Sequence, residues 1–320
     1  MCAKPASAFE GVRSRYRLRA TLLVGRARVS TIATMRILVT GASGFIGRHL
    51  VSALSDRYEV FAAVRDPLRV GFNGRANVLD MDLAGPLDMK VLPARLDVIV
   101  HLAQANVSFP ESANELWAVN TGSTQHLLDY ARRVGARRFI LASTGDVYGR
   151  RFGPCKESDP VAATSYYALT KQAAELLTQA YTGYLETSIL RLFHPYGPDQ
   201  SDRLIPRLAD AIRQGKAIQL NQDDRPRLTP IYVGDVVMAI ALAVDSSGSG
   251  VVNIAGDRVV SVRELAEEIG GVLESKPLFE ETNEESADMI GGNELMKQMF
   301  GAWPMIALAD GLSRTLKGKR

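Results

Sequence analysis

The segment Thr40–Gly47 (T-G-A-S-G-F-I-G) constrains the fold more than any other stretch of this 320-residue chain. It follows the apolar run Met35–Val39, which is typical of a buried parallel strand, and it precedes residues whose apolar side chains recur at helical spacing. Gly41 permits a tight turn, Gly44 lets the backbone approach a pyrophosphate, and Gly47 lets the helix pack closely on the strand. The N–H groups and the positive dipole end of that helix then face the phosphates. The segment predicts a dinucleotide-binding turn.

Apolar runs and amphipathic helical stretches alternate from Met35 onward. This alternation is typical of a doubly wound parallel sheet, so we expect an α/β protein with a Rossmann-type fold. After the first strand, the expected strands lie at residues 58–64, 77–83 and 97–104 and within 138–149.

The composition is that of an ordinary water-soluble globular protein, with 46% hydrophobic and 23% charged residues. No apolar stretch reaches the roughly 18 residues that a membrane span requires. The two cysteines, Cys2 and Cys155, are far apart and form neither a C-x-x-C pair nor a cluster with metal-ligand spacing. We therefore expect no disulfide framework, no metal site, no membrane partner and a cytoplasmic location.

The first 34 residues are strongly basic. They carry seven Lys or Arg side chains against the single acid Glu10, a balance of +6. Because the whole chain carries +3, residues 35–320 carry about −3, so we expect no basic face for nucleic acid. The segment shares its composition with a mitochondrial presequence. The first strand begins at Met35, however, which favours an upstream start that adds a disordered extension over residues 1–34.

Tyr167 and Lys171 supply a second signal. They lie four residues apart in a helical stretch, so their side chains share one face of the helix. A free phenol has a pKa of about 10, which is too high for a base at neutral pH, but a nearby ammonium group and a nicotinamide cation both favour the phenolate. The neighbouring Tyr166 would need its lysine at the position of Thr170. We therefore predict Tyr167 as the base.

The order of these motifs, together with the G-x-x-G-x-x-G spacing of the turn, resembles the extended short-chain dehydrogenase/reductases. More narrowly, it resembles the NAD(P)-dependent epimerase/dehydratase family, which acts mostly on nucleotide sugars. Further segments that carry the resemblance are H-L-A-Q at 101–104, V-N-T-G-S-T at 119–124, S-T-G-D-V-Y-G at 143–149, L-R-L-F-H-P-Y-G-P at 190–198 and R-L-T-P-I-Y-V-G-D-V at 227–236. The resemblance implies a Rossmann domain at residues 35–194. A smaller substrate-binding portion at 195–320 would be interleaved with the sheet.

The resemblance also implies a set of cofactor-binding residues near the strand ends. They are Gly41, Gly44, Phe45, Ile46, Gly47, Arg65, Asp82, Leu83, Leu102, Ala103, Gln104, Asn120, Tyr167 and Lys171. Gln104 stands where the family usually has alanine, which places an amide near the substrate. Asp82 would contact the adenine, although a strand-end cap explains it equally well. His101 lies in an apolar strand and is interpreted as a core residue.

The catalytic residues implied by the resemblance are Thr144, Tyr167 and Lys171. Thr144 would hold a sugar hydroxyl or keto oxygen, with Ser143 as the competitor for that role. Dehydratases of the family carry T-D-E here. This chain carries T-G-D, so only Asp146 remains and elimination chemistry lacks one of its two acids.

The substrate-binding residues implied by the resemblance are Ser143, Thr144, Asp146, His194 and Arg227. Arg227, with Arg225 as second candidate, would pair with the nucleotide diphosphate, because a planar guanidinium suits phosphate oxygens. His194 replaces an asparagine of the family, and it either faces the ligand or packs within its loop.

The end of the second strand bears on which nicotinamide cofactor is bound. An acidic residue about 20 positions past the glycine turn selects NAD, but Val64 stands there and Arg65 follows. The Arg65 guanidinium suits a 2′-phosphate, which favours NADP over NAD. A shift of the loop would instead bring Asp66 to the ribose and restore NAD binding.

The predicted function is hydride transfer at a carbon of a nucleotide sugar, giving epimerisation or keto-sugar reduction. Two alternatives are a reductase of a non-sugar carbonyl and a non-catalytic redox sensor that keeps the dinucleotide fold. The resemblance also implies a homodimer. It would pair through the helix that carries Tyr167 and the helix at residues 124–131, whose apolar positions otherwise only face the sheet.

Overall fold

The computed structural model describes residues 34–72, 74–85 and 87–317. Apart from Thr34, the expected basic extension over residues 1–34 lies outside the described residues.

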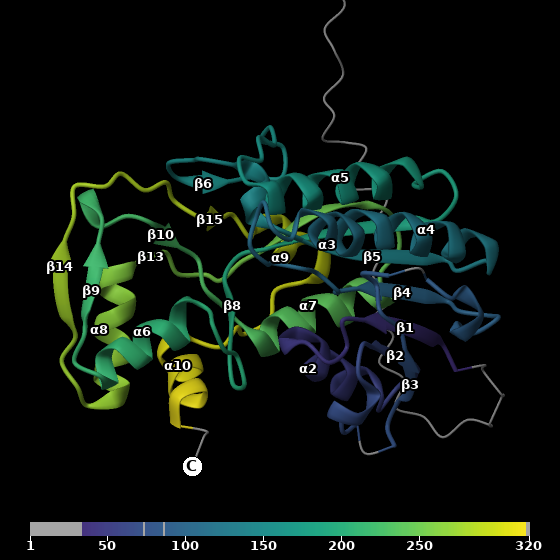
Figure 1. Cartoon of the computed structure of the whole chain (residues 1–320), viewed down its shortest axis with the longest axis horizontal. Helices are drawn as coiled ribbons and strands as arrows, with labels where there is room; N and C mark the ends of the chain where they lie inside the picture. Colours follow the sequence, from purple (N-terminus) through teal and green to yellow (C-terminus); the bar gives the residue numbers. More distant parts are fainter. Residues whose placement is uncertain (1–33, 73, 86, 318–320) are drawn as a thin grey trace, which may run out of the picture.

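A seven-stranded parallel sheet forms the centre of the molecule, with strand order β12-β7-β5-β4-β1-β2-β3 (Figure 1). The strands are β1 (Arg36–Thr40), β2 (Glu59–Val64), β3 (Asn77–Asp80), β4 (Val98–His101), β5 (Arg138–Thr144), β7 (Glu186–Leu192) and β12 (Gly250–Ile254). The strand order reverses between β1 and β4, and ligands of open α/β sheets bind outside the carboxyl ends of strands at such a point. The predicted Rossmann-type α/β fold is confirmed.

Alternating residues of each buried strand face two separate cores. Ile37 and Val39 of β1 pack against one set of helices, whereas Leu38 between them packs against the other set. The first layer contains α2 (Phe45–Leu54) and α7 (Val233–Asp245). The second contains α3 (Ala113–Trp117), α4 (Ser123–Arg133) and α5 (Tyr166–Ala180). Figure 1 shows the two layers on opposite faces of the sheet. Because helices cover both faces of the sheet, side chains on both faces of each central strand are buried, which explains the continuous apolar runs in the sequence.

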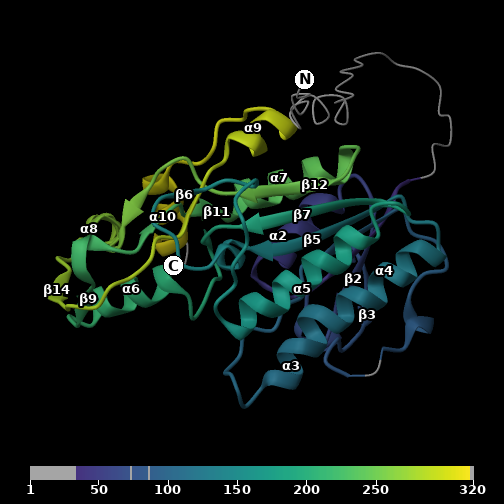
Figure 2. The same ribbon diagram turned by 90° about the horizontal axis from the view of Figure 1, so that it is seen from above.

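A smaller portion beside the sheet has a core of its own (Figure 2). Its helices are α6 (Leu204–Arg213), α8 (Val262–Leu273) and α10 (Leu308–Lys317). Its strands are β9 (Ala217–Leu220), which pairs with β14 (Leu278–Glu281), and β10 (Arg227–Leu228), which pairs with β13 (Val260–Ser261). Helix α8 begins with a complete capping box, in which Ser261 and Glu264 bind each other's backbone N–H groups.

Short elements connect the two parts. They are β6 (Pro154–Cys155), which pairs with β15 (Ile290–Gly291), β8 (Pro195–Tyr196), which pairs with β11 (Ile231–Tyr232), and α9 (Glu294–Phe300). After α6, β9 and β10, the chain returns to the sheet through α7 and β12 before it builds α8. No helix among the described residues is long and apolar enough to span a membrane.

Candidate active site

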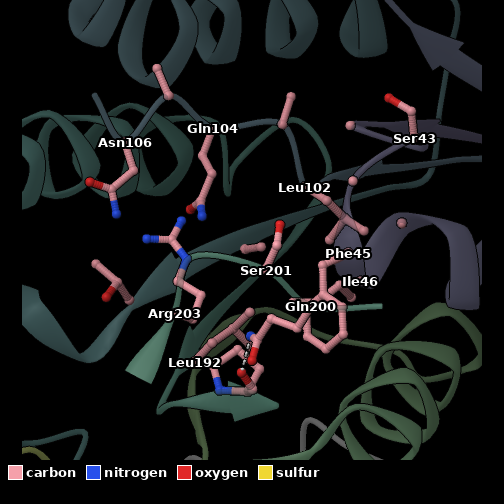
Figure 3. Close-up of a pocket in the computed structure, with 18 of the residues that line it drawn as sticks. Ser43, Phe45, Ile46, Leu102, Gln104, Asn106, Leu192, Gln200, Ser201 and Arg203 are labelled. Atoms are coloured by element: carbon pink, nitrogen blue, oxygen red, sulfur yellow. Dashed lines mark hydrogen bonds between the residues drawn. The ribbon is translucent and has the colours of Figure 1, made fainter. Parts of the chain in front are cut away.

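A cavity of about 730 Å³ opens at the carboxyl ends of the strands, and Figure 3 shows part of its lining. Most of the predicted site residues meet there. Those that line it are Gly41, Gly44, Phe45, Ile46, Gly47, Arg65, Asp82, Leu83, Leu102, Ala103, Gln104, Ser143, Thr144, Asp146, Tyr167 and His194. Asn120, Lys171 and Arg227 are not part of the lining.

The glycine turn forms one end of the cavity with its backbone. Gly41 has φ +64°, and a Cβ atom there would lie 2.7 Å from the backbone nitrogen of Ala103. A Cβ at Gly47 would lie 2.2 Å from the carbonyl oxygen of Gly41, so helix and turn touch directly. Gly44 caps α2 without a side-chain hydrogen bond, which leaves the N–H groups of the first helical turn for a ligand. These residues fit the pyrophosphate of a dinucleotide.

The phenol of Tyr167 lines the cavity and interacts with side chains of neighbouring elements. Its hydroxyl donates a 2.8 Å hydrogen bond to Oε1 of Gln104. Burial raises the pKa of the phenol, the carboxylate of Asp146 raises it further, and Arg203 and the Thr144 hydroxyl oppose both effects. Thr144 in turn donates a 2.8 Å hydrogen bond to Asp146. In this structure the phenol is therefore held as a neutral donor.

Ser143 and Thr144 are consecutive strand residues, so their side chains point to opposite faces of β5. Ser143 is buried, and its hydroxyl donates a 2.5 Å hydrogen bond to the carboxylate of Glu175 on α5. The Ser143 hydroxyl is therefore engaged with the protein, whereas that of Thr144 lies beside Asp146 in the cavity.

Lys171 lies one helical turn after Tyr167 and is almost completely buried. Burial lowers its pKa to about 8, and the carboxylate of Glu175 opposes that shift. Glu175 itself accepts hydrogen bonds of 2.6 and 3.0 Å from Arg191 on β7. The buried ion pair between Glu175 and Arg191 thus lies one helical turn beyond Lys171 on α5.

His194 follows β7 in the left-handed backbone region, with φ 46°. Burial lowers its pKa, with Asp146 acting in the opposite direction, and its Nδ1 has no hydrogen-bond partner among the described residues. The side chain therefore lines the cavity as a neutral ring with one free nitrogen.

Arg203 is a cavity residue that no motif indicated. It precedes α6, and Figure 3 shows its guanidinium pointing toward the side chains of Gln104 and Asn106. Its sequence context, a polar loop before an amphipathic helix, is typical of any surface arginine. Only the path of the loop after β8 brings it to the cavity.

Two predicted ligand residues lie elsewhere. Asn120 is buried in a π-helical turn (Ala118–Gly122), where it binds both backbone groups of Ala105 and the hydroxyl of Thr170. It ties the loop after β4 to α5. Arg227 is exposed on β10, and Arg225, the second candidate, pairs with Asp288.

Arg65 and Asp66, in the loop after β2, have different surroundings. Arg65 is exposed and lines the cavity, whereas the Asp66 carboxylate accepts a hydrogen bond from the N–H group of Leu68 and caps a short helical turn. Val64 ends the strand and is buried. Within the described residues, no three His, Cys, Asp or Glu side chains gather closely enough to hold a metal ion.

Comparison with known proteins identifies the family of the chain. The sequence profile of the NAD dependent epimerase/dehydratase family matches residues 37–255. The chain belongs to this family. The family, the enzyme class and the type of function expected from the motifs are thereby confirmed.

Relatives in the family transform nucleotide sugars. The chain is 28% identical to the UDP-N-acetyl-alpha-D-glucosaminuronate decarboxylase of Bacillus cytotoxicus, covering 88% of this chain and 97% of the relative. It is 29% identical to UDP-glucuronic acid decarboxylase 6 of Arabidopsis thaliana, covering 88% and 87%. Among solved structures, MoeE5 in complex with UDP-glucuronic acid and NAD superimposes with a TM-score of 0.79, at 28% identity and with 88% and 98% covered.

Proposed function

We propose that this protein is a nicotinamide-dependent enzyme that oxidises and reduces a ring carbon of a nucleotide sugar. Residues 35–194 would hold the dinucleotide, and the smaller portion within 195–320 would hold the sugar nucleotide. The observation that carries the proposal is the meeting of Tyr167, Thr144 and the glycine turn in one cavity at the switch point of the sheet.

Each residue has a distinct task in this proposal. A bound nicotinamide supplies a hydride acceptor and later a hydride donor. Tyr167, as phenolate, takes the proton of the sugar hydroxyl while the C–H bond of the same carbon breaks, which leaves a ketone. Thr144 would hold the oxygen of that ketone, and a protonated Lys171 would favour the phenolate by its positive charge. A hydride returned to the opposite face of the ketone, together with the proton from Tyr167, would give the epimer.

Arg203 bears on the choice of sugar. Its guanidinium points into the cavity beside Gln104, and neither a hydrogen bond nor an ion pair joins it to another described residue. A cation in that position favours a substrate whose carboxylate is attached to the ring carbon adjoining the reacting carbon. UDP-sugars of the uronic acid type, which the relatives named above transform, are therefore the first substrates to test. Oxidation of the ring carbon that lies β to such a carboxylate gives a β-keto acid, so decarboxylation is the second candidate activity.

The proposed dinucleotide is NADP. Arg65 reaches the cavity where an acidic residue would select NAD, and the Asp66 carboxylate caps its own turn. MoeE5 contains NAD, so direct competition between the two cofactors decides the matter.

The proposed assembly is a homodimer through α4 and α5. Leu169 and Leu176 lie seven residues apart on α5, share one helical face and are 49% and 61% exposed. A second copy of the same face would cover them. The expected cytoplasmic location remains a prediction from the cysteine content.

A panel of nucleotide sugars tests the function. Purified protein with NAD⁺ or NADP⁺ is incubated with UDP-glucuronic acid, UDP-N-acetylglucosamine, UDP-glucose and dTDP-glucose, and products are identified by NMR. We expect turnover of UDP-glucuronic acid, with a rate that falls about 100-fold or more in Tyr167→Phe but is retained in Tyr166→Phe. Binding of a dinucleotide without turnover would support the sensor alternative. Absence of stabilisation by every nucleotide sugar would favour a non-sugar carbonyl.

Two substrates that differ in a carboxylate test the proposed role of Arg203. Arg203→Ala should raise KM for UDP-glucuronic acid about tenfold or more and leave KM for UDP-glucose nearly unchanged. Equal effects on the two sugars would contradict recognition of a carboxylate.

A further inference from the structure

Gln104 differs from the other cavity residues because it contacts the predicted base directly. Its Oε1 accepts the hydrogen bond of the Tyr167 hydroxyl at 2.8 Å. The residue follows β4, on a loop that Asn120 fixes to α5 through Ala105. The same helix carries Tyr167, so the amide and the phenol are held on a common support. An alanine at position 104, as in the motif that this segment resembles, would offer the phenol no acceptor.

The direction of this bond determines its effect. A phenol can donate to an amide oxygen, but a phenolate has no proton to give and would face the partial negative charge of that oxygen. A hydrogen bond made only by the neutral form stabilises the neutral form. Gln104 therefore opposes the ionisation that the proposed role of Tyr167 as a base requires.

Other charged and titratable groups face Tyr167 from several elements. Asp146 after β5 and Arg203 before α6 act on the pKa of the phenol, and His194 after β7 and Glu115 on α3 line the same cavity. Lys171 lies one helical turn further along α5 and is buried. The Thr144 hydroxyl also lowers the pKa of the phenol. Asp146 and Gln104 thus act together against Arg203 and the Thr144 hydroxyl.

We infer that Gln104 is a positioning residue that holds the proton of Tyr167 and sets the pH at which this base becomes active. The inference rests on the proposed role of Tyr167. It predicts that the base ionises only when substrate draws the hydroxyl away from the amide, which would restrict proton removal to the loaded site.

Two substitutions of similar size test the inference. Gln104→Met removes the acceptor and keeps the length of the side chain, whereas Gln104→Glu keeps an oxygen acceptor and adds a negative charge. Loss of one neutral hydrogen bond should move the rising limb of the kcat/KM profile to lower pH by roughly half to one unit. The Glu variant should move it to higher pH. Asn106→Leu, another cavity amide, is the control and should leave the midpoint in place.

A second measurement needs no turnover. Full-length protein labelled with [13Cζ]tyrosine is titrated by NMR with saturating NAD⁺ or NADP⁺, and the Tyr167 signal is assigned with Tyr167→Phe. The midpoint should fall in Gln104→Met and rise in Gln104→Glu. Equal midpoints, or the opposite order, would overturn the inference. If no nucleotide sugar reacts, the proposed function fails, but this titration still decides whether Gln104 controls the phenol.

Discussion

The hydroxyl of Ser143 donates a 2.5 Å hydrogen bond to the carboxylate of Glu175, and Arg191 donates two more to the same carboxylate. These residues belong to β5, α5 and β7, so one buried carboxylate joins the helix that carries Tyr167 to two strands of the sheet. Arg191 also lies 4.7 Å from the ring centre of Tyr148, which packs against its other side.

Removing one charge of this pair should be costly. Glu175→Gln leaves the guanidinium of Arg191 buried without its counter-ion, so we expect a loss of about 3–5 kcal/mol in the free energy of unfolding. Urea denaturation measures it. The control is Asp129→Asn on α4, which breaks the exposed pairs with Arg132 and Arg133 and should cost about 1 kcal/mol or less. Similar losses in both variants would contradict the importance of burial.

Lys171 should make stability depend on pH. Burial lowers its pKa from 10.5 to about 8, so the folded protein binds fewer protons than the unfolded chain between these values. The cost of the buried ammonium is therefore fully present below pH 8 and is relieved as pH rises toward 10.5. Lys171→Met should stabilise the protein by up to about 3 kcal/mol at pH 7 and much less near pH 10. The exposed Lys156→Met is the control. A gain independent of pH would refute the explanation.

Arg65 should discriminate between the two nicotinamide dinucleotides. Arg65→Ala removes a charged partner of the 2′-phosphate, so Kd for NADPH should rise about tenfold or more while Kd for NADH changes little. Fluorescence titration measures both. Arg95→Ala, which removes a guanidinium near Asp97, controls for net charge. A wild-type Kd for NADH several-fold below that for NADPH would exclude the NADP proposal.

The outer face of α5 should set the oligomeric state. Leu169→Glu together with Leu176→Glu places two like charges in the proposed interface, so light scattering should change from a dimer mass to a monomer mass at micromolar protein. Leu68→Glu alters a residue that is 97% exposed on another element and should leave the dimer intact. A monomer mass for the unmodified protein would remove the dimer proposal.

The sequence predicted the fold well because its signals are local. The run Met35–Val39, the glycine turn and the following helix each have a pattern that few structures satisfy. The spacing of Tyr167 and Lys171 likewise places two side chains on one helical face without any knowledge of tertiary structure.

Contacts between distant loops were not predictable in this way. Arg203 reaches the cavity through the path of the loop before α6, and a sequence pattern contains no record of that path. The bond between Gln104 and Tyr167 joins residues 63 positions apart. Ser143 and Thr144 were both candidates because strand alternation separates their directions but does not say which hydroxyl is bound to Glu175 and which lies beside Asp146.

The return of the chain to the sheet limits how the protein can be divided. A fragment that stopped at β8 would lack β12, which completes one edge of the sheet, and α7, which covers part of its face. Apolar side chains of the strands would then be open to water, and β7 would become an unprotected edge. The part proposed to bind the dinucleotide is therefore not separable from the rest of the chain, and an exchange of specificity between relatives has to proceed by grafting loops.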